Sequence, residues 1–175
     1  MSNDTIDFEI RRAGPNDAAT LSRISAETFA ATFGDIYYPR DLEAYLNSAY
    51  TLEKSRGELS DPETAVWLAE RGGVAIGYIH VGRCDLPHPE VTPDCGELKR
   101  VYLTPAAQGG GIGSRLMDEG LAWLLRGGPR HIWLGVWSGN RAAQRLYARQ
   151  GFEKVGEYYF KVGEALDREF IMRRD

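Results

Sequence analysis

A glycine-rich segment is the part of this chain whose residue types and position point most directly to chemistry. Gln108-Gly109-Gly110-Gly111-Ile112-Gly113 lies between a predicted strand, 97–103, and a predicted helix, 114–125. The start of a helix presents backbone N–H groups without partners in the helix, together with a partial positive charge. Glycine lets the main chain approach a pyrophosphate without interference from Cβ. The segment is therefore predicted to bind an anion, although a plain strand-to-helix turn has the same composition.

Two other nucleotide-binding motifs do not fit this segment. A P-loop has the pattern G-x-x-x-x-G-K-[ST], and no lysine occurs between Gln108 and Arg130. The dinucleotide-binding pattern G-x-G-x-x-G fails in register, because Leu116 stands where the third glycine belongs. The next predicted strand also ends without the acidic residue which that pattern requires. The segment is therefore not predicted to belong to a P-loop NTPase or a dinucleotide-binding domain.

Length, charge and hydropathy limit the classes of protein to which this chain can belong. A chain of 175 residues with 43% hydrophobic content is typical of one globular domain, here residues 1–175. The net charge of -4 disfavours nucleic-acid binding, which needs clustered Lys and Arg, and suits a cationic substrate better. No window approaches the roughly 20 apolar residues of a membrane span, and the first ten residues lack a signal-peptide pattern. We therefore expect a cytoplasmic protein without a membrane partner.

The cysteines and histidines do not have the spacing of a metal site. Cys84 and Cys95 lie in a stretch rich in Pro and Asp, and His80, His88 and His131 are scattered along the chain. Neither H-x-x-H nor C-x-x-C occurs. We expect no metal, and in a reducing compartment we expect both cysteines to be free thiols.

The pattern of apolar residues predicts an α/β fold. The predicted strands are 8–11, 64–71, 74–83, 97–103, 131–136, 152–161 and 165–173. The predicted helices follow the turn at 14–17 as far as Phe33, then cover 40–56 and 114–125, and finally run from Asn140 until Gly151. A strand-helix-strand unit crosses over into parallel pairing, so strands 97–103 and 131–136 are expected to form a parallel central pair in a mixed sheet.

The glycine-rich segment matches the Q/R-x-x-G-x-G/A element of the GNAT acetyltransferase superfamily. Downstream, residues 140–152, NRAAQRLYARQGF, resemble the family's N-x-x-A-x-x-x-Y-x-x-x-G-F signature. Two motifs in order are far more specific than one. The chain is also similar to PaiA-type polyamine acetyltransferases at several short segments: Glu27-Thr28-Phe29, Thr32-Phe33, Ala44-Tyr45-Leu46, 132–137 and 160–163.

The resemblance implies a fold and a set of residues that bind acetyl coenzyme A. The GNAT fold is a mixed, mostly antiparallel sheet with helices on both faces, whose parallel central strands splay apart to admit the pantetheine arm. The strand before the glycine segment would bind the acetyl and pantetheine groups through its main chain. The implied coenzyme-binding residues are Val101, Tyr102, Leu103, Gln108, Gly109, Gly110, Gly111, Ile112, Gly113, Ser114, Asn140, Ala143 and Tyr147. By its residue type, Asn140 is also predicted to cap its helix.

Two side chains are predicted to transfer protons. An amine attacks a thioester only when uncharged, and alkylamines have pKa values of about 10, so a base must help. Glu97 matches a position that often carries Glu in the family and is the predicted base; a surface carboxylate paired with Lys99 or Arg100 is the alternative. Tyr147 maps onto the family's tyrosine that protonates the leaving thiolate; a tyrosine that only packs its ring is the alternative.

An acidic stretch is the candidate acceptor side. Carboxylates that line a cleft would attract a polyamine, although a solvated helix face has the same composition. Tyr37, Tyr38 and Tyr50 could contact the cation through their rings or simply pack. Within residues 35–63 the acidic residues are Asp35, Asp41, Glu43, Glu53, Glu58, Asp61 and Glu63, against Arg40, Lys54 and Arg56.

These expectations combine in an acetyl-CoA-dependent N-acetyltransferase for the primary amine of a small molecule, with a polyamine as one candidate. The alternatives are a non-catalytic coenzyme A-binding module, such as a sensor, and an acetyltransferase for protein N-termini, amino acids or aminoglycosides. No nucleic-acid or membrane partner is expected. Pairing of the C-terminal strands across a homodimer is left open by the sequence.

Overall fold

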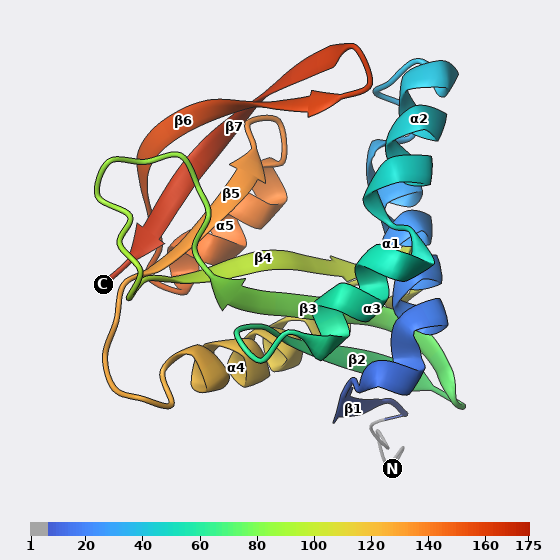
Figure 1. The fold of residues 1–175 in the computed structure, drawn as a ribbon, viewed down its shortest axis with the longest axis horizontal. Coiled ribbons are helices and arrows are strands. Elements are labelled where there is room, and N and C mark those ends of the chain that lie inside the picture. The colour runs from blue at the N-terminus through green and yellow to red at the C-terminus, as the bar shows by residue number, and fades with distance from the viewer. Residues whose placement is uncertain (1–6) are drawn as a thin grey trace.

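The computed structural model describes residues 7–175 (Figure 1). The first six residues lie outside this range. They are part of the N-terminal segment that was expected to lack a signal-peptide pattern. The elements follow in this order: β1 (Glu9–Arg12), η1 (Pro15–Asp17), α1 (Ala18–Phe33), α2 (Pro39–Ala49), α3 (Leu52–Ser60), β2 (Ala65–Arg71), β3 (Val74–Arg83), β4 (Gly96–Leu103), η2 (Pro105–Ala107), α4 (Ile112–Leu124), β5 (Ile132–Trp137), α5 (Arg141–Arg149), β6 (Glu153–Val162) and β7 (Ala165–Arg174).

The strands form one mixed sheet in the order β1-β2-β3-β4-β5-β7-β6. Strands β4 and β5 are parallel, and the other neighbours are antiparallel, as predicted. The parallel pairing is short, because it joins only Gly96 to Ile132 and Glu97 to Trp133. Beyond these residues the two strands diverge, as Figure 1 shows. The splayed central pair is therefore confirmed.

A β-bulge lies in β4 where the two strands begin to diverge. The register against β3 shifts between Val81, which faces Leu98, and His80, which faces Arg100. Lys99 is therefore an extra residue in β4, and such a residue bends its strand and increases the local twist. The bulge accounts for β4 turning away from β5 directly after its short parallel segment.

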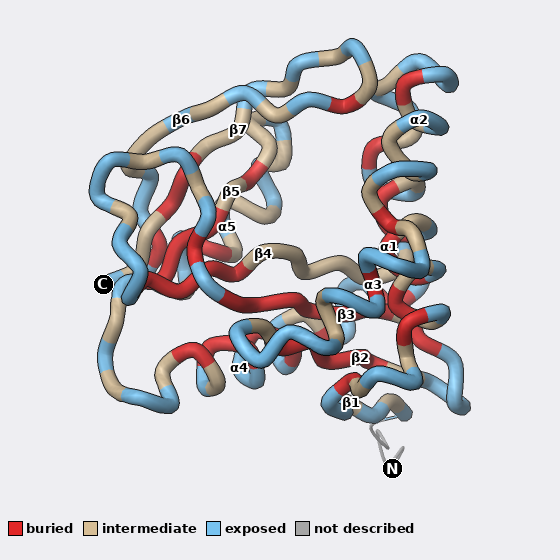
Figure 2. Tube along the Cα trace, in the orientation of Figure 1, coloured by how far each residue is buried: buried red, intermediate tan, exposed pale blue. Residues whose placement is uncertain are grey.

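Helices cover both faces of the sheet. Helix α4 packs on β2, β3 and β4, and α5 adds Tyr147 to the same apolar cluster. Helices α1 and α3 cover the opposite face, where Leu21 and Ile24 are fully buried against β2 and β3. Figure 2 shows the buried positions concentrated along the central strands and on the helix sides that face them.

The predicted helix 40–56 is wrong, because the chain forms two helices there. Helix α2 ends at Ala49, and α3 begins at Leu52 with Thr51 as its N-cap, whose Oγ1 accepts a hydrogen bond from the Lys54 N–H at 3.2 Å. The break turns Tyr50 into the core, where its ring centroid lies 5.8 Å from that of Tyr45. Burying this ring stabilises the fold more than continuing a single helix would.

Within residues 7–175, no helix is long and apolar enough to cross a membrane. In the same range, no three or more His, Cys, Asp or Glu side chains gather in a way that could hold a metal ion. Cys84 and Cys95 are buried free thiols.

Candidate active site

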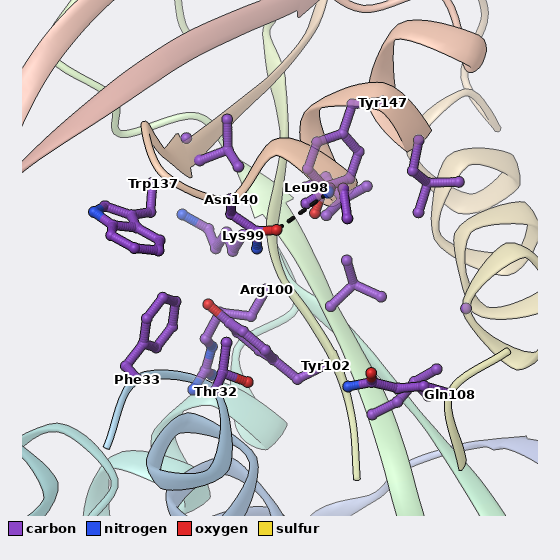
Figure 3. Close-up of a pocket in the computed structure, with 18 of the residues that line it drawn as sticks. Thr32, Phe33, Leu98, Lys99, Arg100, Tyr102, Gln108, Trp137, Asn140 and Tyr147 are labelled. Carbon is purple, nitrogen blue, oxygen red and sulfur yellow. Dashed lines mark hydrogen bonds between the residues drawn. The ribbon is translucent and has the colours of Figure 1, made fainter. Parts of the chain in front are cut away.

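A cavity of about 570 Å³ lies where β4 and β5 separate, and we call it the inter-strand cavity (Figure 3). Its walls come from α1, β4, the glycine-rich loop, β5, α5 and β7, which are far apart in the sequence. It brings together most of the residues that the two motifs assigned to the coenzyme. Those that line it are Val101, Tyr102, Leu103, Gln108, Gly109, Gly113, Asn140, Ala143 and Tyr147.

The remaining predicted coenzyme residues, Gly110, Gly111, Ile112 and Ser114, do not line this cavity. The Ile112 side chain is buried in the apolar core, and Ser114 is exposed. These residues can contribute only through the loop and the start of the helix. Their position next to Gly109 and Gly113 keeps them at the edge of the cavity rather than in its wall.

The glycine-rich loop has the backbone geometry of an anion site. Gly109 and Gly111 have φ values of 84° and 81°, a region that favours glycine, and Gly111 is the N-cap of α4. A Cβ on Gly109, Gly110 or Gly111 would meet nothing within 4 Å, so the loop surface is open. The Arg115 N–H donates to Gly111 O, and the N–H groups before it have no partner inside the helix. The loop can therefore accept a pyrophosphate.

Asn140 fixes the start of α5, as its predicted capping role requires. Its Oδ1 accepts a hydrogen bond from the Ala143 N–H at 3.2 Å, drawn as the dashed line in Figure 3. Gln144 strengthens the same junction, because its Nε2 donates to the main-chain oxygens of Trp137 and Ser138. This clamp between β5 and α5 holds Tyr147, two turns into the helix, at the wall of the cavity.

Tyr147 has the properties of a proton donor. It lies on the α5 side of the inter-strand cavity in Figure 3 and is only 8% exposed. Burial, and then the charge of Glu169, raise the pKa of the Tyr147 phenol to about 12. The phenol is therefore protonated at neutral pH and can donate its proton to a thiolate.

Glu97 lies outside the inter-strand cavity, although it was predicted as the base. It sits on the short parallel segment before β4 and β5 diverge and is 8% exposed. Its Oε2 accepts hydrogen bonds from the Asp85 N–H at 3.0 Å and from Lys99 Nζ at 3.2 Å. The pairing with Lys99 that was the alternative reading is present, in a buried rather than a surface position. The role of Glu97 as a base stays a prediction.

A second cavity, of about 580 Å³, opens on the side of the sheet that faces α1 and α2, and we call it the aromatic cavity. Glu97 lines it. Rings of Phe29 and Tyr45 lie with centroids 4.6 Å apart, so its wall is a packed aromatic cluster. Its aromatic lining residues are Phe29, Phe33, Tyr37, Tyr45, Tyr50, Tyr102, Tyr158 and Phe160.

The aromatic cavity has an excess of negative charge. Its carboxylates are Glu58, Asp85, Glu97 and Glu169. The two cations in its wall are already paired: Lys99 Nζ lies 2.9 Å from Asp85 and also bonds Glu97, and Arg100 bonds Glu58. Burial, and then the charge of Arg100, lower the pKa of His80, which is therefore neutral. Such a lining suits a cationic ligand with an apolar stem.

The acidic stretch 35–63 does not line this cavity as a whole. Of its carboxylates only Glu58 is in the wall, while Asp41 is buried at the start of α2 and accepts the Glu164 N–H at 3.1 Å. Tyr37 and Tyr50 line the cavity, but Tyr38 is 73% exposed and does not. Most of the negative charge comes instead from β4, the loop after β3, and β7.

Glu169 and Arg149 line the inter-strand cavity but were not among the predicted site residues. Arg149, at the end of α5, adds a cation to the inter-strand cavity. Glu169 lies in β7 opposite Trp137, and burial, followed by the charge of Asp167, raises the pKa of its carboxyl group to about 7. One signal was available: in a strand, Glu169 shares a face with the buried Ile171, where a carboxylate is unusual.

The two cavities meet along a common wall. The residues that line both are Phe33, Lys99, Arg100, Tyr102, Gly135 and Glu169. At Gly135 an added Cβ would lie 2.7 Å from the Tyr158 hydroxyl, so the absence of a side chain lets the Tyr158 ring cross β5 at this junction. A molecule in the aromatic cavity therefore borders the same residues as one held between β4 and β5.

Comparisons with known proteins agree with this geometry. The chain is 29% identical over 170 residues, 95% of this chain and 96% of the relative, to an uncharacterised N-acetyltransferase of Lactobacillus delbrueckii subsp. lactis. It is 36% identical over 120 residues, 67% of this chain and 70% of the relative, to the N-alpha-acetyltransferase RimI of Mycobacterium tuberculosis. The crystal structure of PaiA N-acetyltransferase from Thermoplasma acidophilum in complex with coenzyme A shares the fold, with a TM-score of 0.77, 23% identity, and coverage of 100% of this chain and 99% of that one.

The family model described as acetyltransferase (GNAT) matches residues 23–152. This match includes both sequence motifs, the splayed strand pair and every lining residue of the inter-strand cavity except Glu169. The cosubstrate that such a cavity serves is acetyl coenzyme A. The chain therefore belongs to the GNAT acetyltransferase family and is an N-acetyltransferase.

Proposed function

We propose that this GNAT enzyme acetylates the primary amine of a small cationic molecule, with a polyamine as the leading candidate. The observation that carries the proposal is the common wall between the inter-strand cavity and the aromatic cavity. One cavity has a loop suited to a pyrophosphate, and the other has aromatic rings and four carboxyl groups against two cations. A thioester and a cationic amine would therefore approach the same junction from opposite sides of the sheet.

The residues of each cavity would contribute different parts of the reaction. The start of α4 and its loop would hold the pyrophosphate, and the main chain of Val101 to Leu103 would align the pantetheine arm. Fixing both reactants in one geometry supplies much of the rate acceleration in such transfers. Tyr147 would give its proton to the departing thiolate, because its phenol is protonated and faces the cavity.

Acetylation of protein N-termini is the second candidate, and the identity to a RimI enzyme favours it. A peptide acceptor would present one α-amine and a bulky chain, whereas a polyamine presents several charges on a thin apolar stem. The aromatic walls and the paired cations of the aromatic cavity support the polyamine. The two candidates differ in how the rate depends on the charge of the acceptor.

The test is a panel of acceptors assayed for coenzyme A release and for the mass of the product. Spermidine, spermine, hexylamine, amino acids, an aminoglycoside and a peptide with a free N-terminus would be compared at equal concentration. We expect kcat/KM to be highest for spermidine or spermine, and lower for hexylamine, which has the stem but one charge. A higher kcat/KM for the peptide would reassign the substrate to protein N-termini. Binding of acetyl-CoA with no transfer to any acceptor would indicate a non-catalytic module.

A further inference from the structure

Glu169 lies at the junction of the two cavities, which the two reactants of the proposed reaction would share. Glu169 lines both cavities, whereas Glu97 lines only the aromatic cavity and Tyr147 only the inter-strand cavity. In the sheet, Glu169 pairs with Trp137 at the carboxyl end of β5, next to the opening that the divergence of β4 and β5 creates. An amine that moves from the aromatic cavity toward a thioester between the strands passes this carboxylate.

The hydrogen-bond partners of the two carboxylates also differ. Glu97 Oε2 is bonded by the Lys99 ammonium and by the Asp85 N–H. Among the residues that the structure describes, no cation lies within ion-pair distance of Glu169, and no donor bonds its carboxylate. The Glu169 oxygens are therefore available to a proton on the substrate, while Oε2 of Glu97 is held by two donors of the protein.

We propose that Glu169, rather than Glu97, accepts the proton that the ammonium substrate loses before it attacks the thioester. This inference rests on the proposed acetylation of a cationic amine and adds the group that activates it. Glu169 would serve as a catalytic residue at the junction, and Glu97 as a structural partner of Lys99 that holds the bulge of β4.

The surroundings of Glu169 suit a base that works near neutral pH. Burial, and then repulsion from Asp167 on the same strand, raise its pKa to about 7, and proton transfer is most efficient when the pKa of the base is near the working pH. Lys99 and Arg100 border the same cavities but are committed to Asp85, Glu97 and Glu58. The titratable groups that interact with it from the other elements are Tyr45 of α2, Tyr102 of β4, Tyr147 of α5 and Tyr158 of β6.

The amine enters the reaction as R–NH₃⁺. The Glu169 carboxylate takes one proton, the freed lone pair forms the C–N bond to the thioester carbon, and the carbonyl π electrons move to oxygen. When the carbonyl re-forms, the C–S bond breaks and the thiolate takes the Tyr147 proton. The second proton lost by nitrogen restores the Tyr147 phenol. Glu169 then releases its proton to solvent, leaving R–NH–COCH₃, the free thiol of coenzyme A and one H⁺.

The kinetic test compares Glu169→Gln with Glu97→Gln, using acetyl-CoA and spermidine across the pH range. We expect Glu169→Gln to lower kcat by about 100-fold or more and to abolish the acidic limb of the kcat profile, with unchanged acetyl-CoA affinity. Glu97→Gln should keep that limb, and Glu169→Asp should keep it at a reduced rate. Glu153→Gln, an exposed carboxylate on β6, is the matched control and should behave as the wild type. A wild-type acidic limb in Glu169→Gln, or its loss in Glu97→Gln alone, would overturn the proposal.

A second measurement separates this inference from the choice of substrate. If spermidine is not acetylated by the wild type, the proposed substrate is wrong, and Glu169 is then examined by ¹³C NMR of glutamate-labelled protein with acetyl-CoA bound. A carboxyl resonance that is lost in Glu169→Gln and titrates near neutral pH supports the proposal. Titration of that resonance in the usual range for glutamate refutes it, whichever amine the enzyme uses.

Discussion

Replacing Glu169 by Gln should stabilise the fold at alkaline pH, because the wild-type carboxylate is then ionised in a half-buried position. Burial raises the pKa of Glu169 from 4.5 to about 7, so the folded state favours the neutral acid. The neutral form makes its full contribution to the free energy of unfolding below pH 4.5, and this contribution is lost as the pH rises toward 7. Above pH 7 the free energy of unfolding does not change further through this group. At 1.36 kcal/mol per pKa unit, the difference is at most about 3 kcal/mol. Gln has a similar shape and cannot ionise.

The assay is urea unfolding of the wild type and of Glu169→Gln at pH 5 and pH 8. We expect the free energies of unfolding to lie close together at pH 5 and to differ by about 2–3 kcal/mol at pH 8, with the variant more stable. For Glu153→Gln, measured in parallel, the difference from the wild type in the free energy of unfolding should be the same at pH 5 and pH 8. A difference that is the same at both pH values, or that shrinks toward pH 8, would show that the Glu169 carboxyl group is not desolvated in the folded state.

Three further outcomes are expected. Tyr147→Phe should lower turnover by roughly 100-fold, because it removes a proton donor and leaves the ring. The affinity for acetyl-CoA, measured in a binding titration, should be nearly unchanged. Equal turnover in the variant and the wild type would remove Tyr147 from the mechanism. Acetyl-CoA should raise the thermal midpoint, since it binds the folded state, and no shift at millimolar concentration would contradict the assigned cavity. Gly57→Ala and Gly120→Ala should have opposite effects in urea unfolding. A Cβ at Gly57 meets nothing within 4 Å, so Gly57→Ala should raise the free energy of unfolding by about 0.5–1 kcal/mol through better helix propensity. A Cβ at Gly120 would lie 2.7 Å from Ile79 and 2.9 Å from Val81, so Gly120→Ala should lower the free energy of unfolding by about 1–3 kcal/mol. Stabilisation at both glycines would show that α4 lies farther from β3 than the structure has it.

Features that depend on neighbouring residues could be predicted from the residue order. The glycine-rich loop, the Asn140 cap and the alternation of the strands arise from interactions over a few positions, and the structure confirms each of them. The parallel pairing of β4 and β5 also follows, because the chain crosses over through α4 in a defined hand. Much of the lining of the inter-strand cavity was therefore predictable, because many of its residues lie in β4 or in the two short motifs on either side of β5.

Features that depend on pairing between distant segments required the folded chain. Tyr50 breaks the predicted helix because it packs against α1 and α2, an interaction that no local pattern contains. The aromatic cavity is assembled from α1, α2, α3, β3, β4, β6 and β7, and of its carboxylates only Glu58 belongs to the acidic stretch. Glu169 reaches the junction because β7 inserts between β5 and β6, in a register that places it opposite Trp137. Side-chain type and alternation specify which face of a strand is polar, but the strand's neighbours, and hence the partners and solvation of a buried carboxylate, are set by the whole sheet.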